Sequence, residues 1–520
     1  MRTAPAQAAP PARPAPRAWA AFARRWPGAT RRHWVITAVL VLAAALRVLV
    51  LLAYRPALIF PDSERYLQFA QHFINGHWVP DTLRPSGYSI LLIPVARSHV
   101  LALAPIVQHL IGLTEGAMVY AVLLRLGARR WVAVLAAIPV LFDPLQLILE
   151  QYILTDVVAT FFVFTALIVL VWKGKTAGPA AAAISGLLLG AAAAIRIADL
   201  ALIFPVLLYV CVAIRPWRRL AVTGSVLALC FLVVVGSYAG WFASTYSRIG
   251  FTLNNGTFLY GRVVQFADCA GMQVPALARP LCPTQPPAQR SPDFYTWSPQ
   301  SPQWTMPVPR SMDRQSIVLD FSLQVIGHQP LTFLKVVGTD VAYGFSPVRG
   351  DGPEHYPVAY LQFDKQFRPY WEVPWVMRVY GHTHAAVQPT LAAFVDRYGQ
   401  FVYVPGPVLA AGLLLALIAM AGATRRSRRS RGSGQRSAIF LFVAVTASAL
   451  VAAAIFAAFD WRYQLPQLTL IPVAAGLGVA ALAGWRRPGP AEERAVSAAP
   501  ATADFVAPPP GPLDAVGEGD

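Results

Sequence analysis

Residues Tyr54–Pro94 read YRPALIFPDSERYLQFAQHFINGHWVPDTLRPSGYSILLIP and directly follow a long apolar run. Within them, the apolar side chains between residues 66 and 74 recur at helical spacing, as in a helix lying on a membrane surface. The charged side chains that flank this helix include Asp62, Glu64, Asp81 and Arg84. Carboxylates at the exit of a first membrane helix, followed by an Arg-Pro turn, are unusual in a simple connector. We therefore interpret this loop as part of an active site.

The composition of the chain is that of a membrane protein. Of its 520 residues 56% are hydrophobic and 13% are charged, whereas about a quarter of a soluble protein is charged. The net charge of +18 is gathered in short basic segments between apolar runs, as the positive-inside rule predicts for cytoplasmic loops. No basic face interleaved with stacking aromatics is present, so we expect no nucleic-acid partner. Abundant Ala, Pro and Arg with few Lys indicate a GC-rich bacterial genome, and hence a bacterial plasma membrane.

Ten membrane spans account for the placement of the basic clusters. The predicted spans are 34–52, about 100–126, 131–142, 155–172, 178–196, 199–214, 220–242, 403–422, 438–459 and 465–484. Arg or Lys residues follow every second span, on the side of the N-terminal tail, which places both termini in the cytoplasm. The predicted fold class is an all-α polytopic membrane protein with a small mixed extracytoplasmic domain.

The spans divide the chain into five predicted parts. These are a disordered tail (1–33), a transmembrane core with the catalytic outer loop 54–99 (34–242), an extracytoplasmic domain (243–402), C-terminal transmembrane helices (403–484) and a second disordered tail (485–520).

The 243–402 insert is predicted to be partly irregular. It opens with strand-like sequence and an Asn-Asn-Gly turn, continues in a Pro-rich loop at 279–310, and then forms two amphipathic helices at about 313–328 and 330–345. Cys269 and Cys282 lie in this polar part, outside the membrane, where oxidation is allowed. A disulfide between them is the favoured interpretation, with two free thiols as the alternative.

Two acidic clusters are predicted to share the outer face. Asp62 suits a helix N-cap, but it can also serve as a general base or as an oxygen ligand for Mg²⁺ or Mn²⁺. Glu64 can share either role or be a solvated acid. The second cluster holds Asp143, a helix stop, with Glu150 and Asp156. Asp156 is a candidate cap and a second candidate metal ligand.

Three arginines are predicted to lie at headgroup depth on the same face. Arg84, Arg196 and Arg462 are suited to bidentate phosphate binding, and the alternative is ordinary snorkelling toward lipid headgroups. Inside the spans, Arg47 and Glu115 are predicted to pair, because burying either charge alone is costly. These two residues favour the alternative function, a transporter or flippase.

With these residues the chain resembles the GT-C superfamily of polytopic glycosyltransferases, in particular its protein-mannosyltransferase and aminoarabinose-transferase-like branch. The motifs that carry the resemblance are Phe60–Tyr66, Arg84–Tyr88, Leu154–Asp156, Ile195–Arg196 and Arg462–Pro466. Two departures leave the subfamily open. The outer insert lies between the seventh and eighth spans, and the fourth-span acid is Asp where Glu is common.

The resemblance implies transfer of a sugar from a polyprenyl-phosphate donor to an extracytoplasmic glycan, lipid or protein. Asp62 would deprotonate the acceptor hydroxyl, which attacks the anomeric carbon with inversion. Arg196 or Arg462 would stabilise the leaving phosphate. Glu64 would act beside Asp62, or it would orient the acceptor or hold a metal with the second acidic cluster. The remaining substrate contacts implied are Arg84, Tyr88, Glu150, Asp156 and Tyr463, and no cofactor other than a divalent cation is expected.

Overall fold

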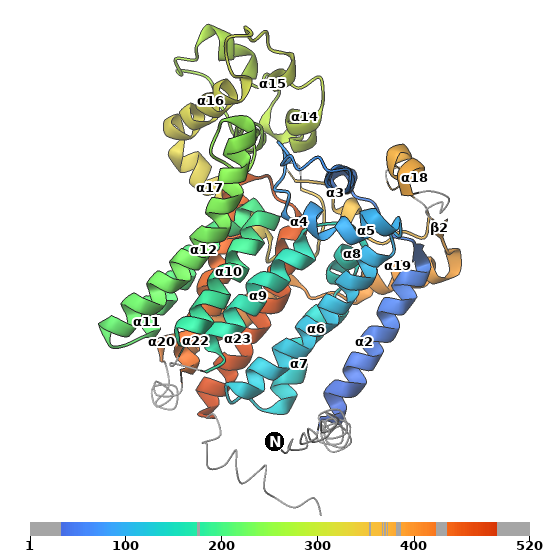
Figure 1. The fold of residues 1–520 in the computed structure, drawn as a ribbon, viewed down its shortest axis with the longest axis vertical. Coiled ribbons are helices and arrows are strands. Elements are labelled where there is room, and N and C mark those ends of the chain that lie inside the picture. The colour runs from blue at the N-terminus through green and yellow to red at the C-terminus, as the bar shows by residue number, and fades with distance from the viewer. Residues whose placement is uncertain are drawn as a thin grey trace, which may run out of the picture.

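The computed structural model describes residues 33–173, 177–352, 355–366, 368, 371, 373–380, 386–422 and 434–485. Both predicted disordered tails lie outside the described residues, apart from residues 33 and 485. The described part is a bundle of long helices with shorter elements gathered at one end (Figure 1). Strand is confined to one antiparallel pair among the described residues, β1 (Tyr54–Arg55) with β2 (Ala386–Val387).

Five helices of the described residues are long and apolar enough to cross a membrane. They are α2 (Trp34–Ala53), α6 (Leu103–Arg125), α12 (Trp217–Tyr246), α22 (Gln435–Phe456) and α23 (Leu465–Ala483) with the turn before it. Two bent pairs raise the number to seven if each is one span. These pairs are α7 (Arg130–Phe142) with α8 (Pro144–Gln151), bent by 47°, and α19 (Pro389–Phe401) with α20 (Gly406–Ala421), bent by 49°.

Three shorter apolar helices complete the bundle. They are α9 (Asp156–Val171), α10 (Pro179–Ile195) and α11 (Ile203–Ala213), the last preceded by η2 (Ile197–Leu202). Each of the ten predicted spans therefore coincides with a helix. The all-α polytopic fold class is confirmed, and the number of spans stays a prediction.

Small residues bring the helices of the bundle close together. α10 packs against both α9 and α12. At Gly186 of α10, an added Cβ would lie 2.3 Å from the carbonyl oxygen of Leu227 on α12. Close backbone approach at small residues is how membrane helices gain packing energy, so a larger side chain here would force the two helices apart.

The end of the bundle that carries the 243–402 insert, called the outer end below, is covered by the loop predicted to be catalytic. It contains α3 (Pro61–Ile74), α4 (Gly87–Leu91) and α5 (Ile93–Ser98) (Figure 1). α3 buries Tyr66, Leu67, Ala70 and Phe73. The helical spacing is confirmed, but this apolar face packs inside the protein and not in lipid.

The insert differs from the sequence prediction at its start. Residues expected to form strands and a turn instead begin α13 (Asn255–Val263). The helix is favoured here because it places Leu259, Tyr260 and Val263 on one buried face that packs on α16 (Arg314–His328). The predicted amphipathic pair is present as α16 and α17 (Pro330–Tyr343), interrupted at Gln329.

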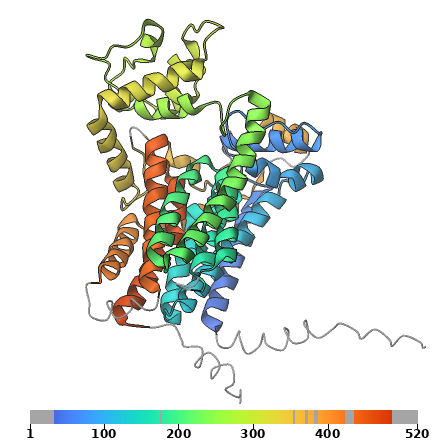
Figure 2. The same cartoon turned by 60° about the vertical axis from the view of Figure 1, so that its left-hand side comes forward.

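The insert does not share a single core. Residues between Leu259 and Val336 form a cluster of their own, whereas Val358, Leu361 and Phe363 pack with the first outer loop. α17 leads from the outer cluster down to the bundle and lies beside α22 (Figure 2).

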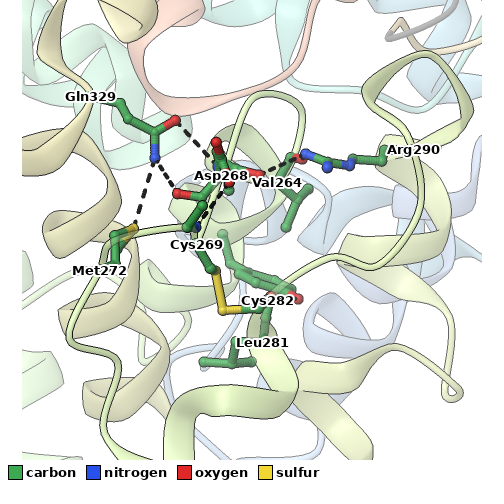
Figure 3. The surroundings of a disulfide bond; sticks show 11 residues. Val264, Asp268, Cys269, Met272, Leu281, Cys282, Arg290 and Gln329 are labelled. Atoms are coloured by element: carbon green, nitrogen blue, oxygen red, sulfur yellow. Dashed lines mark hydrogen bonds between the residues drawn. A yellow bond between two sulfur atoms is a disulfide. The ribbon is translucent and has the colours of Figure 1, made fainter.

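A disulfide joins Cys269 and Cys282, the pairing favoured from the sequence (Figure 3). Its loop is tied to the break between α16 and α17, where Gln329 Nε2 donates to the Asp268 carbonyl at 2.7 Å. The Arg290 guanidinium donates to the carbonyl of Val264 at 2.9 Å on the other side (Figure 3). The segment that leads into the disulfide loop is therefore held from two sides.

Candidate active site

The first outer loop and the α8–α9 junction are locked in register. Leu58 N donates to the Gln151 carbonyl at 3.1 Å, and the Leu58 carbonyl accepts from Ile153 N at 3.3 Å. Ser63 Oγ donates to the Ile153 carbonyl at 2.8 Å and accepts from Phe60 N at 2.9 Å. This register sets the carboxylates that follow each segment on one side of the molecule.

Asp62 lies between two arginines. Its Oδ1 is 2.8 Å from Arg84 Nη2 and its Oδ2 is 3.3 Å from Arg462 Nη1. Phe60 is the N-cap of α3, so Asp62 does not fill the capping role that the sequence left open. Burial disfavours the charge of Asp62, but Arg84 and Arg462 outweigh it and hold the pKa of that carboxyl below its ordinary value. The side chain is an ionised carboxylate.

Asp156 forms the second half of the cluster. It is the first residue of α9 and is 2% exposed. Its Oδ1 is 3.5 Å from Arg196 Nη1, and its Oδ2 is 4.0 Å from Arg462 Nη1. Arg462 therefore bridges Asp62 and Asp156. The three arginines and two of the acids that the sequence analysis predicted on one face come together here. We call this group the ion-pair cluster; its members are Asp62, Arg84, Asp156, Arg196 and Arg462.

Arg462 is held by its own turn, η8 (Trp461–Gln464). Asp460 caps this turn, accepting from Arg462 N at 3.1 Å, and its Oδ2 lies 3.0 Å from Arg462 Nε. The guanidinium carbons of Arg196 and Arg462 lie 5.4 and 5.6 Å from the ring centre of Tyr463. The guanidinium carbon of Arg462 also lies 5.3 Å from the ring centre of Phe60. Such cation–π contacts fix guanidinium groups without neutralising them.

Glu150 is not part of the outer cluster, and this prediction is wrong. Its Oε1 is 2.8 Å from Arg47 Nη2 and its Oε2 is 2.6 Å from His109 Nδ1, all fully buried. α8 bends away from α7 and buries every one of its residues, which turns Glu150 into the bundle. The predicted pair of Arg47 with Glu115 is also wrong, because the Arg47 guanidinium forms its ion pair with Glu150.

Two other expected site residues lie outside the ion-pair cluster. Glu64 accepts from Gln68 Nε2 at 2.9 Å on the same helix. Tyr88 donates to Gln108 Oε1 at 2.8 Å and meets Tyr66 edge to face. Among the described residues, neither side chain forms an ion pair or hydrogen bond with the three arginines of the cluster.

Sequence reasoning missed Tyr66, which lies beside the cluster. The residue is one helical turn after Asp62 on α3, and it is buried. Burial, and next the charge of Asp62, raise the pKa of the Tyr66 hydroxyl. The signal was the spacing of four residues, which places two side chains on one helix face.

Two aromatic residues of the insert were also missed. The Arg84 guanidinium carbon lies 5.2 Å from the ring centre of Phe258 and 5.4 Å from that of Trp297. The two rings meet edge to face at 5.8 Å. The insert therefore contributes directly to the ion-pair cluster.

The carboxylates of the cluster do not suit a divalent cation. In the part of the chain that the structure describes, no three His, Cys, Asp or Glu side chains gather closely enough to hold a metal. Asp62 and Asp156, the expected candidates, present their oxygens to arginines instead. Positive charge at both oxygens would repel a cation, so we derive no step through a metal.

Residues 104–247 match the family model of dolichyl-phosphate-mannose-protein mannosyltransferases. This match confirms the resemblance to the protein-mannosyltransferase branch. The matched segment runs from α6 to α12 and includes Asp156 and Arg196. No curated protein matches the chain.

Three solved structures are similar to the chain at low identity. The Saccharomyces cerevisiae protein O-mannosyltransferase Pmt1–Pmt2 complex bound to the sugar donor shows 17% identity and a TM-score of 0.34, over 45% of this chain and 36% of that chain. The Archaeoglobus fulgidus oligosaccharyltransferase in the apo form shows 15% identity and a TM-score of 0.40, over 85% of this chain and 50% of that chain. ArnT from Cupriavidus metallidurans bound to undecaprenyl phosphate shows 17% identity and a TM-score of 0.34, over 87% of this chain and 78% of that chain. The chain thus spans about a third of the yeast chain and half of the archaeal one.

Proposed function

We propose that the protein is a membrane glycosyltransferase that moves a sugar from a polyprenyl-phosphate donor to a hydroxyl of an extracytoplasmic acceptor, with inversion. The observation that carries this proposal is Asp62, an ionised carboxylate set between two arginines at the outer end of an apolar helix bundle. The family match over residues 104–247 supports the same reaction class. We place the protein in a bacterial plasma membrane with both termini in the cytoplasm.

The donor phosphate would bind Arg196 and Arg462. Both guanidinium groups are fixed by Tyr463 and by Asp156, so they are preorganised for the charge that develops on a leaving phosphate. The two arginines would then supply the positive charge that a divalent cation supplies in metal-dependent enzymes.

A small, mostly apolar cavity lies next to the turn that carries Arg462. The cavity lies between α17 and α22, and it is lined by Leu450, Ala453, Ala454 and Ala457. It ends at Tyr463 and Gln464, the turn that carries Arg462. The apolar side chains at this point of the bundle lie on the side of Arg462 from which a lipid chain would approach.

Asp62 would accept the acceptor proton. The hydroxyl oxygen bonds to the anomeric carbon, the bond from that carbon to the phosphate oxygen breaks, and its electron pair leaves with the phosphate. A carboxylate of low pKa is a weak base. A weak base suffices here because the hydroxyl becomes strongly acidic once its oxygen bonds to the sugar.

Replacing Arg462 by Gln tests the phosphate assignment. We expect kcat/KM for a polyprenyl-phosphate sugar to fall about 10- to 100-fold, because one charge-assisted hydrogen bond is lost. Arg462→Lys should recover part of that loss. The matched control is Arg248→Gln, since Arg248 is 54% exposed and pairs only with Asp313 in the described residues. Equal kinetics for Arg462→Gln and Arg248→Gln would contradict the assignment.

Transport of a lipid-linked substrate is a second candidate function, favoured by Glu115. This residue lies in the middle of α6 and is fully buried. Neither of its carboxyl oxygens has a hydrogen-bond partner among the described residues. Intramembrane acids of this kind mark ion pathways in transporters.

A further inference from the structure

The helix α14 (Pro292–Trp297) covers the ion-pair cluster from the side of the insert. Figure 1 shows it at the edge of the insert that faces the outer end of the bundle. Pro292, Tyr295 and Thr296 are buried, and Tyr295 joins the core of the insert. Trp297 at the end of the helix contacts the Arg84 guanidinium. The helix is thus fixed on one side and faces the cluster on the other.

Asp293 shares the helix face of Trp297. The two residues are four positions apart, so their side chains project in the same direction. Asp293 lies within range of the charge of Asp460, the cap of the turn that carries Arg462. Trp297 contacts the Arg84 guanidinium, so this face of α14 is turned toward the ion-pair cluster.

Asp293 differs from the other acids of the site because it has no cationic partner. Asp62, Asp156 and Asp460 each lie within 4.0 Å of an arginine. Among the described residues, no hydrogen bond or ion pair reaches the Asp293 carboxyl. The side chain is half-buried. Burial, and next the charge of Asp460, raise the pKa of that carboxyl above its ordinary value.

We propose that Asp293 binds the hydroxyl groups of a carbohydrate acceptor, with the Trp297 ring as the apolar surface beside it. This inference rests on the proposed function. A carboxylate accepts hydrogen bonds from two neighbouring hydroxyls, a pattern that a sugar offers and a single Ser or Thr side chain does not. The Trp297 side chain is 37% exposed, which leaves ring surface for the C–H groups of a sugar.

The geometry connects this acceptor position to the reaction. Arg84 contacts both Asp62 and Trp297. A sugar held by α14 is therefore presented next to the proposed base, with the donor phosphate on the far side of Asp62. Asp293 orients the acceptor, and Asp62 takes its proton.

The test is binding of methyl glycosides to the purified full-length protein, measured by saturation-transfer NMR. The probes are methyl α-D-mannopyranoside, methyl β-D-glucopyranoside, methyl β-D-galactopyranoside and methyl α-D-arabinofuranoside, together with a Ser/Thr-rich peptide. We expect at least one glycoside to bind, Asp293→Asn to weaken it at least tenfold, and Asp293→Glu to recover most of the affinity. The matched control is Asp320→Asn, an exposed acid on α16 of the same insert.

Several results would overturn the proposal. These are equal glycoside affinities for Asp293→Asn and Asp320→Asn, absence of binding by every glycoside in the panel, or peptide binding that depends on Asp293. Where sugar transfer is measured, Asp293→Asn should raise the KM for the acceptor while the KM for the donor stays within twofold. Absence of transfer by the wild type would count against the glycosyltransferase, whereas a wild type that transfers with an Asp293-independent acceptor KM would count against this inference alone.

Discussion

Replacing Asp62 by Asn should lower the turnover of sugar transfer by about 100- to 10,000-fold, the range for loss of a general base. The amide keeps the shape of the carboxylate but cannot take a proton. It also leaves Arg84 and Arg462 without their shared anion. The measurement is the initial rate of label transfer from a polyprenyl-phosphate sugar, with equal amounts of membrane-inserted protein.

Glu64→Gln is the informative comparison for this variant. Glu64 lies on the same helix two residues away, but its described contact is to Gln68 and not to an arginine. We expect its loss to change turnover less than threefold. A fully active Asp62→Asn protein would remove Asp62 from the reaction, and a Glu64→Gln protein as inactive as Asp62→Asn would return Glu64 to the catalytic role expected from its sequence position.

Replacing Arg47 by Leu should destabilise the protein by about 3–5 kcal/mol, the cost of breaking a buried pair from one side. Arg47 is 2% exposed, and its guanidinium donates to Glu150 and to the carbonyls of Leu141 and Val140 at 2.8 to 3.2 Å. The substitution leaves Glu150 charged and without its main partner. Thermal unfolding in detergent should show a large loss of Tm.

A double substitution separates the charge effect from the loss of packing. Arg47→Leu with Glu150→Leu should recover more than half of the lost stability, because neither member of the pair is left charged without the other. Glu115→Gln should change Tm little, since neither Glu115 oxygen is hydrogen-bonded among the described residues. A single and a double variant with the same Tm would contradict the view that this ion pair holds α2 to α8.

The apolar runs could be predicted from the sequence, and so could the gathering of several loop charges at one end of the bundle. Each predicted span became a helix, and the helical spacing in the first outer loop became α3. Arg84, Arg196 and Arg462 could be brought together because the alternation of spans places their loops on one face. Hydropathy and basic clusters indicate which loops share an end of the bundle, but not which of their side chains meet.

Depth and long-range contact could not be predicted in the same way. Glu150 follows a span boundary, yet the bend between α7 and α8 turns it toward Arg47, and no periodicity encodes such a bend. Trp297 and Asp293 lie in a Pro-rich stretch that is expected to be loop. The approach of Trp297 to Arg84 depends on how α13 packs on α16 and α14, which a local pattern does not describe.

The most direct test of the central claim is transfer by the purified wild-type protein from a panel of radiolabelled polyprenyl-phosphate sugars to a mixed glycan and peptide acceptor pool. The account predicts that label moves covalently from one of these donors to an acceptor, and that excess polyprenyl phosphate inhibits the reaction by occupying Arg196 and Arg462. Passage of an intact lipid-linked sugar across the membrane of a sealed vesicle, with no label on any acceptor, would contradict it and would favour the transporter.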